Sequence, residues 1–261
     1  MDLGLKDKVI IVTGGGAGIG EGISRACLAE GARVVVLSRR SENVQHFMAE
    51  MTSAGAPCTL IEAHLEDTDR CREAIAEVER QFGGIYAPVN NAGVNDGVGL
   101  ESGSVERFQE SLRKNLIHYY ALAHYALPAL KRSQGAIVNI SSKVALTGQG
   151  NTSGYAASKG AQLALTREWA AELLPFNVRV NAVLPAEVMT PLYERWLKTL
   201  GDPDAKLREI TSKIPLGKRM TLSSEIAAAV AFLLSPTQSA HTTGQHLIVD
   251  GGYVHLDRAL T

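Results

Sequence analysis

The segment YAASK places a phenol and an ammonium one helical turn apart, at Tyr155 and Lys159. The residues that follow, GAQLALTREWAAELL, are rich in alanine and leucine and predict a helix, in which residues four apart share a face. A tyrosine ordinarily ionises near pH ~10, and a neighbouring positive charge favours its phenolate form. The pair is therefore a candidate acid–base device, although a Tyr and a Lys at this spacing also occur as an ordinary surface pair.

A glycine-rich turn, TGGGAGIG, follows the first β-branched run of the chain. Its spacing is GxxxGxG, with Gly14, Gly18 and Gly20 in the three positions, and no start among these glycines fits GxGxxG. Glycines in such a turn let the backbone approach a pyrophosphate at the N-terminus of the following helix. We therefore predict a dinucleotide-binding turn, with a turn that binds nothing as the alternative.

The end of the second β-branched run, LSRRSEN, contains the residues expected to select the dinucleotide. Ser38 is followed by Arg39 and Arg40, and the first acidic residue after them is Glu42. An acidic residue at this point would bind the ribose hydroxyls of NAD and repel a 2′-phosphate. Two guanidinium groups and a hydroxyl instead suit a phosphate. The sequence predicts NADP in preference to NAD, unless both arginines are ordinary surface residues.

Short apolar runs alternate with stretches of helical spacing along the whole chain. Strands that alternate with helices predict a parallel sheet covered on both faces, the doubly wound α/β class of the Rossmann fold. The sequence shows no repeat, low-complexity tract or linker, so residues 1–261 are predicted to form a single domain. The predicted strands are residues 8–13, 32–38, 57–63, 85–90, 135–141, 178–184 and 246–250.

Residues 186–215 interrupt this alternation with a long polar segment that contains Tyr193 and Trp196. In a doubly wound sheet, ligands bind beyond the carboxyl ends of the strands. An insertion after the strand that ends at Leu184 would therefore cover that site. We predict a helical substrate lid here, with a connecting helical hairpin as the alternative.

The overall composition disfavours several classes of function. The formal net charge of -1 gives no support for binding to nucleic acid or to an anionic membrane surface. The N-terminal MDLGLKDK is too charged for a signal peptide, and no apolar run approaches the length that spans a bilayer. The three cysteines form no CxxC pair, so neither a disulfide framework nor a metal site is predicted. We expect a cytoplasmic protein without a metal ion.

Several separate motifs together resemble the short-chain dehydrogenase/reductase family. They are TGxxxGxG at residues 13–20, NNAG at 90–93, Asn115, Ser142 and YAASK at 155–159. VRVNAVLPAEVMTP and TGQHLIVDGGY resemble two further segments of the family, so the likeness covers nearly the whole chain. The sequence departs from the family pattern at three positions: Ala186 replaces a glycine, His64 replaces an aspartate near adenine, and Ala17 replaces a basic residue of some NADP-dependent members.

The resemblance implies an oxidoreductase in which Tyr155 is the general acid–base. By the same resemblance, Lys159 lowers the pKa of Tyr155 and holds the cofactor ribose. Ser142 would hydrogen-bond the reacting oxygen and stabilise charge there. Asn115 would hold a water that links Lys159 to solvent.

The resemblance also implies which residues contact the cofactor, some of them through backbone atoms. Val188 and Thr190 belong to the segment that closes over the nicotinamide and would bind its carboxamide. The complete predicted set is Gly14, Gly16, Gly18, Ile19, Ser38, Arg39, Arg40, His64, Leu65, Asn91, Ala92, Gly93, Tyr155, Lys159, Pro185, Val188 and Thr190.

Within the family, the sequence is most similar to sugar dehydrogenases that oxidise L-fucose and related aldoses. That resemblance implies that Tyr155 removes the proton of the anomeric hydroxyl while C1 gives hydride to NADP, so that an aldonolactone leaves. Glu187 is the residue expected to distinguish a sugar site from a lipid site, because sugar hydroxyls can satisfy a carboxylate. The predicted substrate-binding residues, several of which could equally be solvated loop residues, are Asn95, Ser142, Lys143, Gln149, Tyr155, Glu187 and Trp196.

Two alternatives compete with a sugar dehydrogenase. The first is an NADP-dependent carbonyl reductase of the same family, acting on a 3-oxoacyl or steroid substrate. The many charged residues of 186–215 disfavour a steroid. The second is a non-catalytic protein that only senses NADP(H), which the intact catalytic residues disfavour.

The resemblance also predicts a homotetramer. Members of the family commonly assemble through the helix of residues 111–130, the YAASK helix and the last strand. An apolar face buried within one protomer would explain the same pattern. The residues that suggest this face are Leu116, Tyr119, Tyr120, Ala123 and Tyr125.

Overall fold

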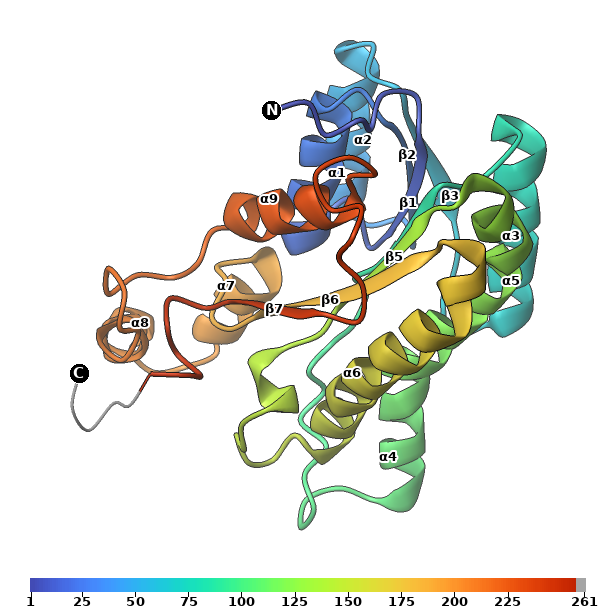
Figure 1. The fold of residues 1–261 in the computed structure, drawn as a ribbon. Helices are drawn as coiled ribbons and strands as arrows, with labels where there is room; N and C mark the ends of the chain where they lie inside the picture. The colour runs from blue at the N-terminus through green and yellow to red at the C-terminus, as the bar shows by residue number, and fades with distance from the viewer. Residues whose placement is uncertain (257–261) are drawn as a thin grey trace.

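Within residues 1–256, which the computed structural model describes, seven parallel strands form one sheet (Figure 1). Their order across the sheet is β3-β2-β1-β4-β5-β6-β7, so the doubly wound Rossmann prediction is confirmed. Each strand lies within the apolar run predicted for it, except that β6 continues one residue further to Pro185. The strands are β1 (Val9–Thr13), β2 (Arg33–Ser38), β3 (Cys58–Glu62), β4 (Ala87–Asn90), β5 (Ala136–Ile140), β6 (Arg179–Pro185) and β7 (His246–Val249).

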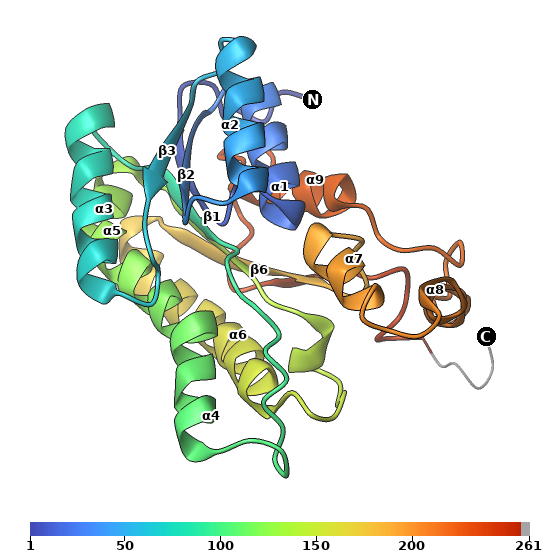
Figure 2. The ribbon, with the colours of Figure 1, turned by 180° about the vertical axis from the view of Figure 1, so that it is seen from behind.

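Helices cover both faces of the sheet, as Figures 1 and 2 show from opposite sides. Successive side chains of a strand point to opposite faces. Ile10 and Val12 accordingly pack with α1, α2 and α9, whereas Val9 and Ile11 pack with α3, α5 and α6. The first layer consists of α1 (Gly18–Ala29), α2 (Glu42–Ser53) and α9 (Ser223–Leu234), and the second of α3 (Thr68–Phe82), α5 (His118–Ser133) and α6 (Ser153–Leu173).

The chain changes direction across the sheet beside β1. β1 pairs with β2 on one side and with β4 on the other, through Ile11 with Val35 and Ile11 with Pro88. The turns after β1 and β4 therefore diverge, and they open a crevice at the carboxyl ends of these strands. The fold places the predicted dinucleotide turn and the NNAG motif on the two sides of this crevice.

The segment predicted as a lid forms two short helices, α7 (Pro191–Leu197) and α8 (Pro203–Ser212), which extend beyond the sheet next to β6 and β7 (Figure 1). Thr190 caps α7 by accepting from the Tyr193 N–H, and Asp202 caps α8 in the same way. A parallel bridge between Val188 and Thr221 joins the two ends of the excursion, and the Thr221 N–H donates to the Glu187 carbonyl at 2.9 Å. The insert is therefore closed at its base.

None of the helices within residues 1–256 is both long enough and apolar enough to cross a membrane.

Candidate active site

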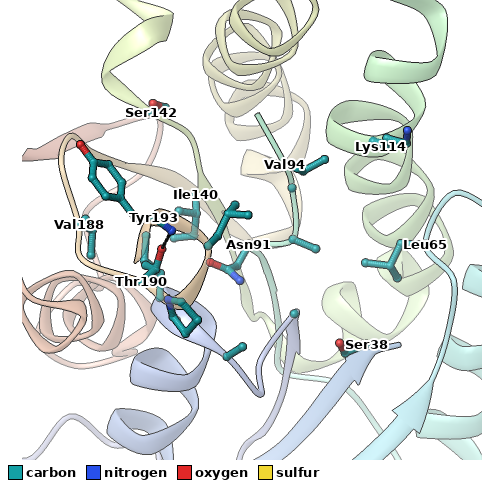
Figure 3. Close-up of a pocket in the computed structure, with 18 of the residues that line it drawn as sticks. Ser38, Leu65, Asn91, Val94, Lys114, Ile140, Ser142, Val188, Thr190 and Tyr193 are labelled. Atoms are coloured by element: carbon teal, nitrogen blue, oxygen red, sulfur yellow. Dashed lines mark hydrogen bonds between the residues drawn. The ribbon is translucent and has the colours of Figure 1, made fainter. Parts of the chain in front are cut away.

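A cleft of about 470 Å³ lies at the carboxyl ends of the strands. It is elongated, with Ser38 and Leu65 near one end and Ser142 and Tyr193 near the other (Figure 3). Its lining includes the turns after β1, β2, β3, β4, β5 and β6 and residues of α1, α2, α5, α6 and α7. Residues that are far apart in the sequence thus share one cavity of a size that suits a small molecule.

The glycine turn leaves room for a phosphate at the start of α1. Gly14 and Gly18 have φ values of +64° and +57°, in the left-handed region that favours glycine. A Cβ on Gly20 would lie 2.2 Å from the Gly14 carbonyl oxygen, so only glycine fits there. No side chain caps the N-terminus of α1 at Ala17, so its first N–H groups can serve a bound anion. These residues fit the pyrophosphate of a dinucleotide.

Thr13 joins the two sides of the crevice. Its hydroxyl accepts from the N–H groups of Asn91 and Ala92 at 2.8 and 2.9 Å, and the Asn91 side-chain amide donates back to the Thr13 carbonyl at 2.8 Å. These bonds hold the NNAG segment against the glycine turn. Asn91, Ala92 and Gly93 consequently line the cleft with their positions fixed, as a backbone surface for a cofactor requires.

The two arginines after β2 occupy different surroundings. Arg39 lines the cleft with Ser38, and none of the ion pairs recorded for residues 1–256 includes it. Arg40 lies outside the lining and forms an ion pair with Glu62 at 3.1 Å. The residues present at this end of the cleft that fit a 2′-phosphate are therefore Ser38 and Arg39.

The predicted catalytic residues converge at the other end of the cleft. Tyr155 lies in the first turn of α6, Ser142 follows β5, and both line the cavity. Lys159 lies one turn further along α6 and is almost fully buried, with its Nζ 5.4 Å from the centre of the Tyr155 ring. The sheet and one helix thus bring a phenol, a hydroxyl and an ammonium together.

The ionisation of this group differs from the prediction. Burial raises the pKa of Tyr155 to about 12, and its hydrogen bond with Ser142 acts in the opposite direction. Burial also lowers the pKa of Lys159 to about 7. The predicted lowering of the Tyr155 pKa by Lys159 is therefore not found. The physical reason is that burial penalises the charge on both groups, and the Lys159 ammonium donates instead to the Ile140 carbonyl at 2.7 Å.

Asn115 lies behind the cleft in a π-helical segment, η1 (Arg113–Ile117), between α4 (Val105–Leu112) and α5. Its side chain is fully buried and accepts from the Val94 N–H at 2.7 Å while donating to the Ser111 carbonyl at 3.0 Å. Its backbone carbonyl accepts from the Gln162 Nε2 at 2.7 Å. Gln162 thus links the Asn115 carbonyl to Lys159 directly, because it lies on the same face of α6 as Lys159. The water through which Asn115 would link Lys159 to solvent stays a prediction.

Glu187 was predicted to bind the substrate, but its carboxylate is not free in the structure. One of its oxygens is ion-paired with Lys143, and the other accepts from the Tyr193 hydroxyl at 2.8 Å. Lys143 also stacks on the Tyr253 ring, with its Nζ 4.1 Å from the ring centre. Both charged side chains are mostly buried, so each needs the other as a partner. Of this cluster, Tyr193 lines the cleft.

Some of the other predicted residues line the cleft, and some lie outside its lining. Most of the predicted cofactor set lines the cleft, but Gly16, Arg40 and His64 do not. A Cβ on Gly16 would lie 3.0 Å from the Val44 side chain, so this glycine serves packing against α2. Of the predicted substrate residues, Ser142 and Tyr155 line the cavity. Those outside the lining are Asn95, Lys143, Gln149, Glu187 and Trp196.

Several residues of the site were missed from the sequence. Lys114 and His118 line the cleft, and Gln162 contacts Lys159 from below. His118 and Gln162 lie three residues after Asn115 and Lys159, and that helical spacing was the available signal because such residues share a face. Lys114 is the direct neighbour of Asn115, and no such spacing signals it. Within the described part of the chain, no cluster of histidine, cysteine, aspartate and glutamate could hold a metal ion.

Comparisons with known proteins agree with this geometry. A family model described as enoyl-(acyl carrier protein) reductase matches residues 14–254. L-Fucose dehydrogenase from Bos taurus is 39% identical over 246 residues, which cover 94% of this chain and 88% of that protein.

Two solved structures are also similar. The crystal structure of Cj0485 dehydrogenase has a TM-score of 0.94 and 46% identity, and the match covers 100% of this chain and 99% of that one. The aldohexose dehydrogenase of Thermoplasma acidophilum has a TM-score of 0.88 and 32% identity over 99% and 98% of the two chains. Because these matches run through the glycine turn, the catalytic end of the cleft and the last strand alike, the chain belongs to the short-chain dehydrogenase/reductase family and is an oxidoreductase.

Proposed function

We propose that the chain oxidises an aldose, L-fucose or a related sugar, at C1 to the aldonolactone with NADP as the hydride acceptor. The observation that carries the proposal is the polar wall next to the catalytic end of the cleft. There Tyr193 faces the cavity, supported by the mostly buried ion pair of Lys143 and Glu187. The Tyr193 hydroxyl donates to Glu187 and can still accept a hydrogen bond, which a polyhydroxylated substrate can donate and the apolar face of a steroid cannot. The likeness to L-fucose and aldohexose dehydrogenases supports the same substrate class.

Tyr155 is the proton acceptor of the proposed reaction. The substrate is placed with its anomeric hydroxyl between Tyr155 and Ser142, both of which line the cavity. Tyr155 removes the hydroxyl proton as hydride leaves C1, and Ser142 donates a hydrogen bond to the oxygen that becomes the lactone carbonyl. When bound, the oxidised cofactor supplies the hydride acceptor and a positive ring charge that favours the Tyr155 phenolate. Lys159 adds its own charge from behind, and its ammonium holds the ribose in exchange for its 3.4 Å bond to the Tyr119 hydroxyl.

The preference for NADP rests on Ser38 and Arg39. Arg39 lines the cleft and has no recorded carboxylate partner within residues 1–256, so its guanidinium is available to a 2′-phosphate. The Ser38 hydroxyl lies at the same end of the cavity (Figure 3). A phosphate there forms charge-assisted hydrogen bonds, which are stronger than neutral ones.

We propose roles for the polar insert and for the assembled protein as well. Residues 186–215 act as the substrate-covering insert, with α7 as the part that borders the cleft. The protein acts in the cytoplasm as a homotetramer. For the helix face suggested for assembly, Tyr119 and Ala123 are buried within the protomer, whereas Tyr120 is 55% exposed and remains available.

A steady-state assay of purified protein with a panel of aldoses and hydroxysteroids, each with NADP and with NAD, tests the proposal. We expect turnover with L-fucose or a stereochemically related aldose, a lactone product and a lower KM for NADP than for NAD. Turnover of a 3-oxoacyl thioester or a steroid in preference to every aldose would replace the substrate assignment. Cofactor binding without turnover of any substrate would favour the sensor alternative.

A further inference from the structure

Lys159 is a buried ammonium whose partners are neutral oxygens. The residue is 3% exposed, and its Nζ donates to the Ile140 carbonyl at 2.7 Å, to the Gln162 Oε1 at 3.3 Å and to the Tyr119 hydroxyl at 3.4 Å. In residues 1–256, none of the recorded ion pairs includes Lys159. A buried cation without a carboxylate depends on the dipoles that face it.

Gln162 connects this ammonium to Asn115. It is fully buried on α6, three residues after Lys159, so the two side chains share a helix face. Its Oε1 accepts from Lys159, and its Nε2 donates to the Asn115 carbonyl at 2.7 Å. The orientation of the amide is dictated by its partners, because an ammonium can only donate and a backbone carbonyl can only accept.

An amide and a water act differently in this position. A water can take a proton on one side and release another on the opposite side. A carboxamide between Lys159 and Asn115 keeps its donor and its acceptor fixed, so it stabilises a charge without conducting a proton. The bridge therefore fixes the ammonium and does not itself carry a proton.

We infer that Gln162 is a positioning residue that keeps Lys159 charged and fixed behind Tyr155. The inference rests on the proposed function, in which Tyr155 is the base and Lys159 supports its phenolate. Gln162 supplies one of the two main dipoles that face the Lys159 ammonium, and the Ile140 carbonyl supplies the other.

The other groups around Lys159 do not supply a counter-charge. Burial raises the pKa of Tyr155 to about 12 and that of Tyr119 well above its usual range, so both phenols are neutral at pH 7. Burial lowers the pKa of His118 to about 4, so this imidazole is neutral as well. Lys114 on η1 pairs with Glu110 on α4 at 3.2 Å. Gln162 and the Ile140 carbonyl are therefore the main dipoles that stabilise the ammonium.

The ammonium can be titrated directly in the full-length protein without cofactor or substrate. Lysines are labelled with ¹³C at Cε, and the Lys159 NMR signal is identified by its loss in Lys159→Met. Gln162→Met removes the acceptor while keeping the side-chain length, and Gln162→Glu replaces it with a carboxylate. We expect the titration midpoint of Lys159 to fall by about one pH unit in Gln162→Met and to rise by at least about one unit in Gln162→Glu.

Thr166→Val is the matched control. Thr166 is equally buried on the same helix and donates to the Gln162 backbone carbonyl at 2.7 Å, without a recorded bond to Lys159. The control should keep the parent midpoint, and thermal unfolding of each variant identifies any that has lost its fold. The expected shift of the Lys159 midpoint has a different sign in each Gln162 variant, so either variant that folds suffices as a test.

Shifts of the same sign in both Gln162 variants, or a Thr166→Val shift equal to that of Gln162→Met, would overturn the inference. The titration needs no turnover, so it stays readable even if no aldose is oxidised. An active aldose dehydrogenase whose Gln162 variants leave the Lys159 midpoint unchanged would overturn this inference alone.

Discussion

The floor of the cleft around Lys159 and its wall at α7 satisfy their polar groups in different ways. On the floor, Asn115, Lys159 and Gln162 are buried and bonded to one another or to backbone carbonyls. On the wall, most side chains are exposed, and Trp196 is 43% exposed against Tyr193. A buried network tolerates few arrangements, whereas an exposed helix tolerates many. We therefore expect the floor to determine the chemistry of the reaction and the wall to determine which substrate is accepted.

The floor should give the largest effect when its proton acceptor is removed. Tyr155→Phe deletes only the hydroxyl that we propose as the proton acceptor, so we expect turnover to fall by about 10³-fold or more, since general-base catalysis contributes about 10²–10⁴-fold. NADP affinity, measured by fluorescence titration, should stay within a few-fold of the parent. Turnover within tenfold of the parent would remove Tyr155 from its assigned role.

The cofactor end of the cleft offers a paired test. Arg39→Asp exchanges a phosphate partner for a ribose partner and should raise the KM for NADP by about 10- to 100-fold, the equivalent of ~1.5–3 kcal/mol for bonds to a charged group. Use of NAD should improve at the same time. Arg40→Asp is the matched control, because Arg40 pairs with Glu62 outside the cleft lining. Equal effects of the two substitutions would mean that only overall charge matters here.

The buried imidazole of His118 on the floor should make the free energy of unfolding sensitive to acid. Burial lowers the pKa of His118 from 6.5 to about 4. Because the folded pKa is depressed, the stability contribution is fully present above pH 6.5 and is lost as the pH falls toward 4. Between pH 7 and pH 4.5, His118→Leu should lose less free energy of unfolding than the parent, by roughly 2 kcal/mol. Urea denaturation at both pH values measures the difference, and equal losses in the two proteins would contradict it.

The base of the wall should give the smallest and most selective effect. Glu187→Ala leaves Lys143 and Tyr193 without their shared partner, so we expect kcat/KM for the best aldose to fall by about tenfold, within the range for bonds to charged groups. The ratio between two aldose epimers should change as well, while NADP affinity stays constant. Glu194→Ala, at an exposed position on α7, is the control. If the ratio of kcat/KM between aldose epimers is unchanged in Glu187→Ala, the wall does not take part in substrate selection.

The sequence predicted the fold and the catalytic end of the cleft because both follow from local signals. β-Branched runs favour strands, and glycines favour tight turns. Tyr155 and Lys159 lie on one helix and Ser142 follows one strand, so their spacing in the sequence already indicated that they lie together. Glu187 and Gln162 were misjudged or missed for a different reason. Their partners, Lys143 and Asn115, lie 44 and 47 residues away in the chain, and no local pattern reveals such pairs.

The bridge between Val188 and Thr221 has a consequence for how this protein can diversify. Residues 189–220 leave and return at one point on the sheet edge. A change in the length of this segment therefore need not move the strands to which it is attached. Doubling the length of a flexible loop whose ends are joined costs only about 0.6 kcal/mol. A relative could therefore exchange, lengthen or shorten this excursion with little loss of stability, and acquire new substrates while inheriting its hydride chemistry intact.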